Sequence, residues 1–328
     1  MIVGLDLGYS AIKLASSDPK GAPPHLARFP AGACPIAHLP KAMGGDVDLG
    51  SAVRVDIDGE TYAALAEPRD FQNFQPPLHE FYSQSREYRA LFLASLFKVG
   101  ARHIDFLVTG LPVSQAKDRD FRLKLQDTLT GEHRIRDSLT VTVGRVKVLP
   151  QPVGAWMNWL IDNPPYRTRD VRALIFDVGF YSVDWVILER GKVLDAASGS
   201  SYLATSKVLE EAARLIQLEH KTRYSLARLE EAMRSGQPNY FVGDRELPLQ
   251  PMLNRAARNI AENVLNEVRQ SLRTQTDSLD LILLAGGGSG LYANAVREAF
   301  PQVRVVVAGD AVMANARGFY YFGEASRT

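Results

Sequence analysis

Two stretches of the chain share one order: an apolar strand, an acid, a glycine turn and a second strand. In the N-terminal stretch Asp6 and Gly8 follow an apolar run, and Lys13 lies on the returning strand. In the middle of the chain Asp177 and Gly179 occupy the same places. Glycine lets the backbone turn tightly and approach a ligand closely, and consecutive turn amides can form an anion-binding concavity. One such hairpin is common in proteins that bind no nucleotide. Two at equivalent places favour a duplicated architecture with a phosphate site.

The two acids are candidate magnesium ligands. Asp6 and Asp177 each stand at the end of an apolar strand, and Mg²⁺ keeps several waters and takes few protein carboxylates. If the hairpins belong to opposed domains, their turns can hold a polyphosphate between them with both acids near one ion. Lys13 offers a point charge to phosphate.

A third element is the glycine run at 285–290, which directly follows a buried apolar strand. Consecutive glycines let the backbone lie flat against a flat ligand such as a nucleobase with its sugar. An ordinary strand-to-helix turn is the alternative interpretation. The run is not a dinucleotide fingerprint, because Leu291 falls where the last glycine of that motif would stand, and no G-x-x-x-x-G-K-[ST] loop occurs in the chain.

Each half of the chain continues as alternating helices and strands, which is typical of α/β proteins. Alternation around Asp58-Gly59 predicts a β-hairpin, and the proline-rich stretch 15–50 predicts turns and irregular edges. The hydrophobic periodicity predicts helices at about 85–99, 114–129, 202–218, 225–233, 291–300 and 311–322, and one more helix that ends at about 272. It predicts further strands at 104–109, 140–143, 146–149, 192–197, 281–284 and 303–307.

Length and charge narrow the class of protein. A chain of 328 residues is long for one core and predicts two domains of about 150 residues each. The net charge of +1 gives no bulk signature of nucleic-acid or membrane binding.

The single Cys34 excludes an internal disulfide and fits a reducing compartment. With no apolar run of membrane length, we expect a cytoplasmic protein with no direct membrane or nucleic-acid contact. The six histidines lack metal-ligand spacing, so structural zinc is not expected.

Five landmarks, in this order, resemble the actin, sugar-kinase and chaperone ATPase superfamily. They are the Asp6 turn, Gln151 between two prolines, the Asp177 turn, the glycine run at 285–290 and a closing helix within 309–323. In that superfamily they correspond to the first phosphate loop, the first connecting helix, the second phosphate loop, the adenosine loop and the second connecting helix. The resemblance covers the whole chain. It implies an α/β, actin-like (ribonuclease H-like) two-domain fold with the nucleotide cleft between the domains.

The resemblance also implies domain boundaries. Residues 1–155 would form domain I, with a small insertion at about 15–85, and the closing helix at 309–328 would return to it. Residues 156–308 would form domain II.

Within the superfamily the chain is most similar to the ParM/StbA type and to archaeal actin-like proteins, through the segments 110–113 and 175–179. This similarity implies an ATPase that binds Mg–ATP (or GTP) and polymerises into cytoskeletal filaments, with hydrolysis coupled to assembly. Plasmid segregation through a DNA-bound adaptor is the setting that it suggests. Two alternatives stay open: a non-polymerising ATPase or kinase of the same superfamily, and a degenerate nucleotide-binding scaffold.

Carried over position by position, the resemblance implies roles for individual residues. Asp6 and Asp177 would hold Mg²⁺ through water, and Gln151 and Asp177 would be catalytic, with Gln151 orienting the attacking water. The implied nucleotide-binding residues are Asp6, Gly8, Tyr9, Ser10 and Lys13 in the first loop, Gly179, Phe180, Tyr181 and Ser182 in the second, Lys207 and Glu211 on the helix that follows it, and Gly286, Gly287, Gly288 and Ser289 in the glycine run. A solvated helix face is the alternative reading of Lys207 and Glu211.

The second loop departs from the superfamily pattern. Phe180 and Tyr181 stand where related loops carry small residues, so their side chains must point away from a bound phosphate. Ser182 is a candidate replacement hydroxyl. Asp184 is either an acid near the attacking water or a polar strand residue.

Overall fold

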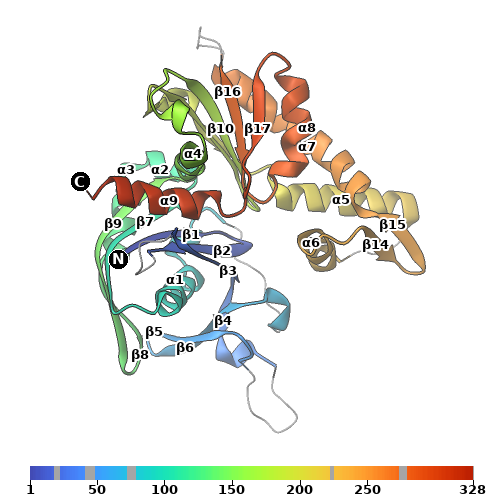
Figure 1. Cartoon of the computed structure of the whole chain (residues 1–328). Helices are drawn as coiled ribbons and strands as arrows, with labels where there is room; N and C mark the ends of the chain where they lie inside the picture. The colour runs from blue at the N-terminus through green and yellow to red at the C-terminus, as the bar shows by residue number, and fades with distance from the viewer. Residues whose placement is uncertain (18–22, 41–48, 72–78, 222–224, 273–278, 328) are drawn as a thin grey trace. The chain divides into compact units, whose positions relative to one another are not determined.

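The computed structural model describes residues 1–17, 23–40, 49–71, 79–221, 225–272 and 279–327. The chain divides into two compact units, Met1–Arg167 with Val312–Thr328, and Thr168–Ala311. We call them unit 1 and unit 2. Each consists of a mixed sheet with helices packed on it (Figure 1), so the fold class is α/β, as the sequence predicts.

The main sheet of unit 1 has the strand order β3-β2-β1-β7-β9-β8. Strands β1, β7 and β9 run parallel to one another, and the hairpin partners β2 and β8 are antiparallel. Because the carboxyl ends of parallel strands meet at one edge, the residues that follow β1, β7 and β9 lie together there. The strands are β1 (Ile2–Leu7), β2 (Ala11–Ser16), β3 (His25–Pro30), β7 (His103–Leu111), β8 (Gly131–Arg136) and β9 (Leu139–Pro150).

Helices cover both faces of this sheet. Alternate residues of β1 point to opposite faces: Val3 and Leu5 pack in the core with α1 and α3, whereas Ile2 packs in the core with α9. The helices of unit 1 are α1 (Arg86–Val99), α2 (Val113–Lys117), α3 (Arg119–Leu129), α4 (Gln151–Asp162) and α9 (Ala314–Ala325), with short 3₁₀ segments at Ile36–His38, Pro68–Asp70, Tyr82–Gln84 and Pro164–Arg167. A separate sheet has the order β4-β6-β5, with β4 (Gly32–Pro35), β5 (Val53–Ile57) and β6 (Glu60–Ala66).

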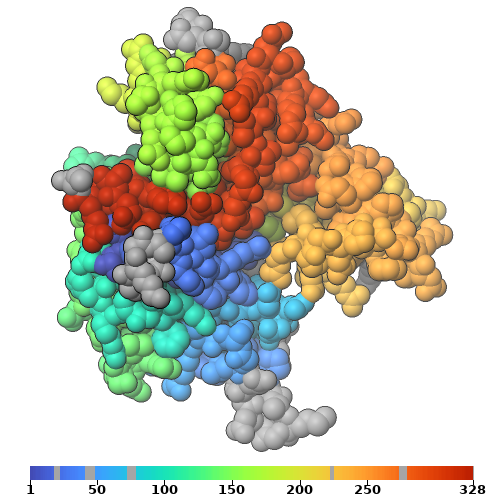
Figure 2. Space-filling model, viewed as in Figure 1, coloured from blue at the N-terminus to red at the C-terminus, as the bar shows by residue number. Residues whose placement is uncertain are grey.

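Helices α4 and α9 of unit 1 cross with their backbones almost touching. A Cβ on Gly318 would lie 1.7 Å from the carbonyl oxygen of Gly154, so only hydrogen fits at that crossing. Phe319, the next residue of α9, is fully buried, and its ring fills the space beside Gly110 and Gly154. Helix α9 lies along the sheet in Figure 1, and its outer side is visible as the dark red band of Figure 2. The closing helix is therefore an integral part of unit 1.

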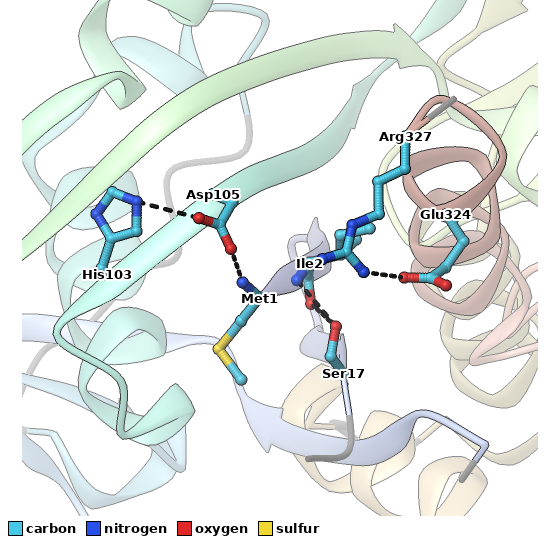
Figure 3. Close-up of polar contacts among 7 residues, drawn as sticks. All are labelled: Met1, Ile2, Ser17, His103, Asp105, Glu324 and Arg327. Carbon is cyan, nitrogen blue, oxygen red and sulfur yellow. Dashed lines mark hydrogen bonds and ion pairs between the residues drawn. The ribbon is translucent and has the colours of Figure 1, made fainter. Parts of the chain in front are cut away.

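Side chains fix the amino end of β1 (Figure 3). The amino group of Met1 is paired with the carboxylate of Asp105 on β7, which His103 also approaches at 3.2 Å. The hydroxyl oxygen of Ser17 accepts a hydrogen bond from the Ile2 amide at 2.9 Å. These contacts set the register of β1 between its neighbours, and with it the position of the turn at the strand's other end.

Unit 2 is built around a second sheet, of order β12-β11-β10-β16-β17, with β13 also paired to β11. Asp177 of β10 is the parallel register partner of Ala285 of β16, so the Asp177 turn and the glycine run leave the sheet at the same edge. The strands are β10 (Arg172–Val178), β11 (Val183–Glu189), β12 (Lys192–Val193), β13 (Gly199–Ser201), β16 (Leu281–Ala285) and β17 (Arg304–Val307).

The helices of unit 2 pack their apolar stripes on this sheet. Helices α5, α7 and α8 contribute most of the buried residues of the unit's core, together with β10 and β16. They are α5 (Thr205–His220), α6 (Leu226–Arg234), α7 (Leu249–Leu272) and α8 (Ser289–Ala299), with a 3₁₀ turn at Asp195–Ala197 and a hairpin of β14 (Asn239–Val242) and β15 (Arg245–Pro248). In the described part of the chain, no helix combines the length and apolar composition that crossing a bilayer requires.

Several expected elements are confirmed, together with the residues that cap or turn them. Helix α1 begins after Ser85, whose side chain accepts a hydrogen bond from the Tyr88 amide, and ends at Gly100 in the left-handed conformation. Strands β5 and β6 pair around Asp58 and Gly59, which both have positive φ, as a tight hairpin requires.

Other expectations were wrong. The single helix expected at 114–129 is two helices, because the Asp118 side chain caps α3 by accepting from the Asp120 and Phe121 amides. The two strands expected at 140–143 and 146–149 are one strand, β9, because β7 pairs with it along most of its length. Residues 195–197, expected to continue a strand, form a 3₁₀ turn.

The proline-rich stretch is more regular than expected. Strands β3 and β4 lie within it, and Pro30 and Pro35 are the last residues of these strands, where a missing amide donor is tolerated. Two parts of this stretch, 18–22 and 41–48, lie outside the described residues.

Candidate functional site

The first loop of unit 1 brings three sequence-predicted residues together. The Asp6 side chain is buried. Its Oδ2 lies 3.1 Å from Lys13 Nζ, and its Oδ1 accepts a hydrogen bond from Gln151 Nε2 at 3.2 Å. The pairing of Asp6 with Lys13 follows from the hairpin, since the two are direct cross-strand partners. Gln151 arrives from the end of β9, two strands away. The structure thus concentrates an acid, a cation and an amide at one edge of the sheet.

The turn itself is shaped by Gly8 and Tyr9. A Cβ on Gly8 would lie 2.8 Å from Lys13 Nζ, so glycine permits the close approach of this lysine. The Tyr9 ring stacks on Tyr82 with centroids 4.3 Å apart, and its hydroxyl donates to the His79 carbonyl at 2.8 Å. These contacts tie the Tyr9 side chain to the segment before α1. Ser10, the last predicted residue of this turn, is half-buried.

Two further tyrosines lie near Asp6, and sequence reasoning did not assign them to the site. Tyr82 and Tyr88 are buried, with rings in edge-to-face contact at 5.4 Å. Burial raises the pKa of both phenols well above its ordinary value, and the nearby Asp6 charge raises it further. Both therefore stay neutral and supply packing beneath the first loop. No local motif signals them, because they come from a segment remote in sequence.

The second loop places two buried carboxylates opposite each other. Asp177 on β10 and Asp184 on β11 are direct cross-strand partners, and both are buried. Asp184 accepts hydrogen bonds from the hydroxyls of Ser182 at 2.6 Å and Ser200 at 2.5 Å. Like charges directly opposite on a sheet repel, so a nearby cation would be stabilised here. Ser182, proposed as a ligand hydroxyl, is bonded to Asp184 in this structure. The sequence gives no signal that would assign Ser200 to this loop.

The backbone of the second loop is held by the start of α5. The Gly179 amide bonds to the Ser182 carbonyl at 2.9 Å, which closes the turn. The Thr205 hydroxyl donates to the Gly179 carbonyl at 2.7 Å, and the Ser206 amide donates to the Phe180 carbonyl at 2.9 Å. Because residues at the start of α5 donate hydrogen bonds to these carbonyls, they fix the loop conformation, and sequence reasoning did not name them.

The bulky side chains of the second loop pack within unit 2. The Phe180 ring packs against the core of the unit, and the Tyr181 ring lies 5.1 Å from the ring of Tyr202. Both aromatic side chains therefore have contacts of their own, which leaves the loop backbone as the part that can face a ligand.

The glycine run packs on the second loop. Gly286 has φ of +84°, and a Cβ there would lie 2.4 Å from both Asp177 Oδ1 and the Val178 carbonyl oxygen. The Gly288 amide donates to the same carbonyl at 2.9 Å, and Ser289 begins α8 as a buried residue. A Cβ on Gly287, in contrast, would meet no atom within 4 Å. Of the three consecutive glycines at 286–288, Gly287 is thus the one whose surroundings are open to a ligand.

Lys207 and Glu211 are bonded to other side chains of unit 2. Lys207 Nζ pairs with Glu210 at 2.7 Å on the exposed side of α5. Glu211 accepts two bonds from Arg214, each of 2.7 Å, and one from Asn259 at 3.1 Å. The hydrogen bonds from Arg214 hold the pKa of the Glu211 carboxyl below its usual value. The predicted nucleotide contacts of both residues stay predictions.

Magnesium fits this donor set better than a metal that needs several protein ligands. Among the described residues, no three His, Cys, Asp or Glu side chains gather as a candidate metal cluster. Mg²⁺ needs only one or two carboxylates because waters and phosphates complete its coordination. The buried, opposed pair of Asp177 and Asp184 meets that requirement in unit 2, and Asp6 meets it in unit 1.

The glycine run offers a matched pair of substitutions. We expect Gly286→Ala to destabilise the protein by about 1–2 kcal/mol through its positive φ alone, and to weaken nucleotide binding because the new methyl displaces Asp177. Gly287→Ala has no neighbour to displace, so its free energy of unfolding should stay within about 0.5 kcal/mol of wild type. Urea unfolding of both variants checks this. Equal stabilities would contradict the described backbone conformation of Gly286.

Two α/β units, each with a buried acid ahead of a glycine turn between two strands, are the architecture of actin-like proteins. Residues 4–154 match the family model of the actin-like proteins' N-terminal domain, and residues 175–298 match that of the archaeal MreB-like actin homologue's C-terminal domain. The chain therefore belongs to the actin-like superfamily.

Solved structures agree on the fold. The chain matches the archaeal actin homologue Ta0583, crystallised with ADP, with a TM-score of 0.77, 18% identity and 99% coverage of both chains. It matches a ParM from a 15-stranded Clostridium botulinum filament with a TM-score of 0.73, 16% identity and 99% coverage of both. It matches the actin-like protein Alp7A with a TM-score of 0.74 and 18% identity, and the match covers 99% of this chain and 96% of that one. No curated protein sequence matches the chain.

Proposed function

We propose that the chain is an ATPase that binds Mg–ATP with the loops of both units and polymerises into filaments. The observation that carries the nucleotide part is the buried, opposed pair of Asp177 and Asp184, against which Gly286 packs so closely that no Cβ fits. Two buried carboxylates beside an open glycine backbone are suited to a cation with its phosphates. The ADP complex of the archaeal homologue supports a nucleotide as the ligand.

Each loop would contribute in its own way. In unit 1 the amides of 8–10 would receive phosphate oxygens, and Lys13, which lies 3.1 Å from Asp6, would supply positive charge. In unit 2 the amides of 180 and 181 would do the same, because the Gly179 amide already donates to the Ser182 carbonyl, and Asp177 would hold the metal through water. When bound, Mg²⁺ would neutralise the negative charge that gathers on the phosphates during transfer.

Gln151 is the residue proposed to orient the attacking water. It is the first residue of α4, so the helix and the following Pro152 restrain its backbone, and its side-chain amide already donates to Asp6 at 3.2 Å. An amide held beside the metal-binding acid can direct a water by hydrogen bonding without taking up charge. Positioning of this kind accounts for most of the catalysis of phosphoryl transfer.

Self-assembly is proposed from the relatives. One of them is the ParM of a 15-stranded filament, and another is a ParM described as a non-polymerisable quadruple mutant. We extend filament formation to this chain on the strength of the shared fold. Plasmid segregation with a DNA-bound adaptor is the corresponding setting, and ATP or GTP is the proposed nucleotide.

Light scattering tests assembly. We expect scattering to rise when Mg–ATP or a non-hydrolysable analogue is added, and to fall later only with ATP, as phosphate is released. ADP should give little or no rise. Phosphate release is measured in the same samples.

The outcomes separate the candidate functions. Phosphate release without scattering, at several protein concentrations, would identify a non-polymerising ATPase and contradict assembly. Nucleotide binding with neither scattering nor release would identify a scaffold.

A further inference from the structure

Unit 1 contains a cavity of about 350 Å³. Its walls come from α1, α3, the 3₁₀ turn before α1, and β8. Small-molecule sites usually begin at about 300 Å³, so this cavity can take a molecule of one or two rings. None of the residues proposed to bind nucleotide contributes to its lining.

The cavity has an apolar floor and a polar rim. Phe92 and Leu125 are buried, and Phe121 is half-buried, so they form an aromatic and aliphatic floor. Lys124 and Thr128, one turn apart on α3, are exposed and form the rim. This division suits an amphipathic ligand with an apolar body and one polar end.

The charge of the rim is positive. Arg89 and Lys124 are its charged side chains, and no acidic residue belongs to the lining. The Arg89 guanidinium lies 3.6 Å from Asp58, which offsets part of its charge. Lys124 Nζ donates to the Gln84 side-chain oxygen at 3.4 Å, and within the described part of the chain it forms no ion pair with a carboxylate. Lys124 is therefore available to an anion.

The interior holds polar groups but no charge. His133 contacts the Phe92 ring edge-to-face at 5.0 Å, and its Nε2 lies 3.0 Å from the Leu129 carbonyl oxygen. Burial lowers the pKa of His133 below its ordinary value, so the ring is neutral at pH 7. The buried hydroxyl of Ser83 has no hydrogen-bond partner among the described residues. An unpaired buried hydroxyl is uncommon and would gain a partner from a ligand's oxygen.

We propose that this cavity binds a small aromatic carboxylate, with its ring against Phe92 and Phe121 and its carboxylate paired with Lys124 at the rim. The class follows from the volume, the aromatic floor and the cationic rim. Tyr88 lines the cavity and also packs beneath the first loop, but no residue proposed to bind nucleotide lines the cavity, and the test does not require ATP to bind.

Calorimetric titration of the full chain with two probes, indole-3-acetate and phenylacetate, tests the proposal. The matched neutral probe is indole-3-acetamide, which has the same ring but no charge. We expect indole-3-acetate to bind about three- to fivefold more tightly than the amide, the ratio that about 0.6–1 kcal/mol from an ion pair at an exposed rim supports. Near-identical affinities for acid and amide would overturn the proposal, as would the absence of binding by both carboxylates at millimolar concentration.

Two variants locate the site. Lys124→Met keeps the apolar stem and removes the charge, so it should reduce the affinity for indole-3-acetate to that for the amide, while Lys192→Met on β12 of unit 2 should change neither. Thr128→Trp fills the rim from an exposed position of α3, so it should abolish binding of both probes with an unchanged far-ultraviolet circular dichroism spectrum and an unchanged midpoint of urea unfolding. Undiminished binding by Lys124→Met or by a folded Thr128→Trp would overturn the proposal.

Discussion

Substitution of Asp177 by alanine is expected to lower the rate of phosphate release by about 10- to 100-fold. The carboxylate is buried at the end of β10, opposite Asp184 and against Gly286. Its removal takes away the proposed outer-shell partner of the metal and leaves the loop backbone without the charge that fixes the ion. The initial rate of phosphate release at saturating Mg–ATP measures the effect.

A control within the same unit tests whether the loss of any carboxylate from unit 2 lowers the rate, and urea unfolding of Asp177→Ala checks that this variant is folded. Asp170 is an exposed acid of unit 2 that is paired with Arg190 at 3.0 Å, and surface pairs of this kind contribute little stability. Asp170→Ala should therefore release phosphate at the wild-type rate. If Asp177→Ala did so too, the proposed magnesium site would be wrong.

Substitution of Gly318 by alanine is expected to have the largest effect on stability. The added Cβ would lie 1.7 Å from the Gly154 carbonyl oxygen and 2.5 Å from its carbon, so α4 and α9 must move apart. Overpacking of this severity costs about 3 kcal/mol or more, whereas alanine regains about 1 kcal/mol of helix propensity over glycine. We expect a net loss of about 2 kcal/mol or more in the free energy of unfolding, measured by urea denaturation.

Gly290 provides the matched control because it is also helical, in α8, and a Cβ there would meet no atom within 4 Å. Gly290→Ala should be neutral or stabilising, by up to about 1 kcal/mol. A Gly318→Ala protein as stable as wild type would show that the two helices do not cross as described.

Local sequence patterns predict much of the fold because they act over short distances. The hairpin that joins β1 to β2 fixes which residue faces Asp6, so the amino-acid sequence alone is enough to assign Lys13 to the first loop. Parallel pairing of β10 with β16, which brings the Asp177 turn beside the glycine run, joins segments remote in sequence and does not follow from a local pattern. The expected α/β class and actin-like fold are confirmed by the sheets and by the family models.

Contacts between residues remote in sequence cannot be predicted in this way. Tyr82 and Tyr88 lie near Asp6 because α1 packs beneath the first loop, and nothing in their local sequence distinguishes them from other core aromatics. The hydroxyls of Ser200 and Thr205 bond to the second loop from β13 and α5. Such partners follow from the tertiary packing of the unit, which a local periodicity does not encode.

Calorimetric titration of the protein with ATP, in the presence of Mg²⁺ and again with the metal chelated, tests the central claim most directly. If the two loops bind nucleotide as proposed, we expect saturable binding of one nucleotide per chain with Mg²⁺. The affinity for ATP should weaken by about tenfold or more when the metal is removed or when Asp177 is replaced by alanine. Absence of ATP binding by the folded wild-type protein, or binding that neither chelation nor Asp177→Ala alters, would contradict the account.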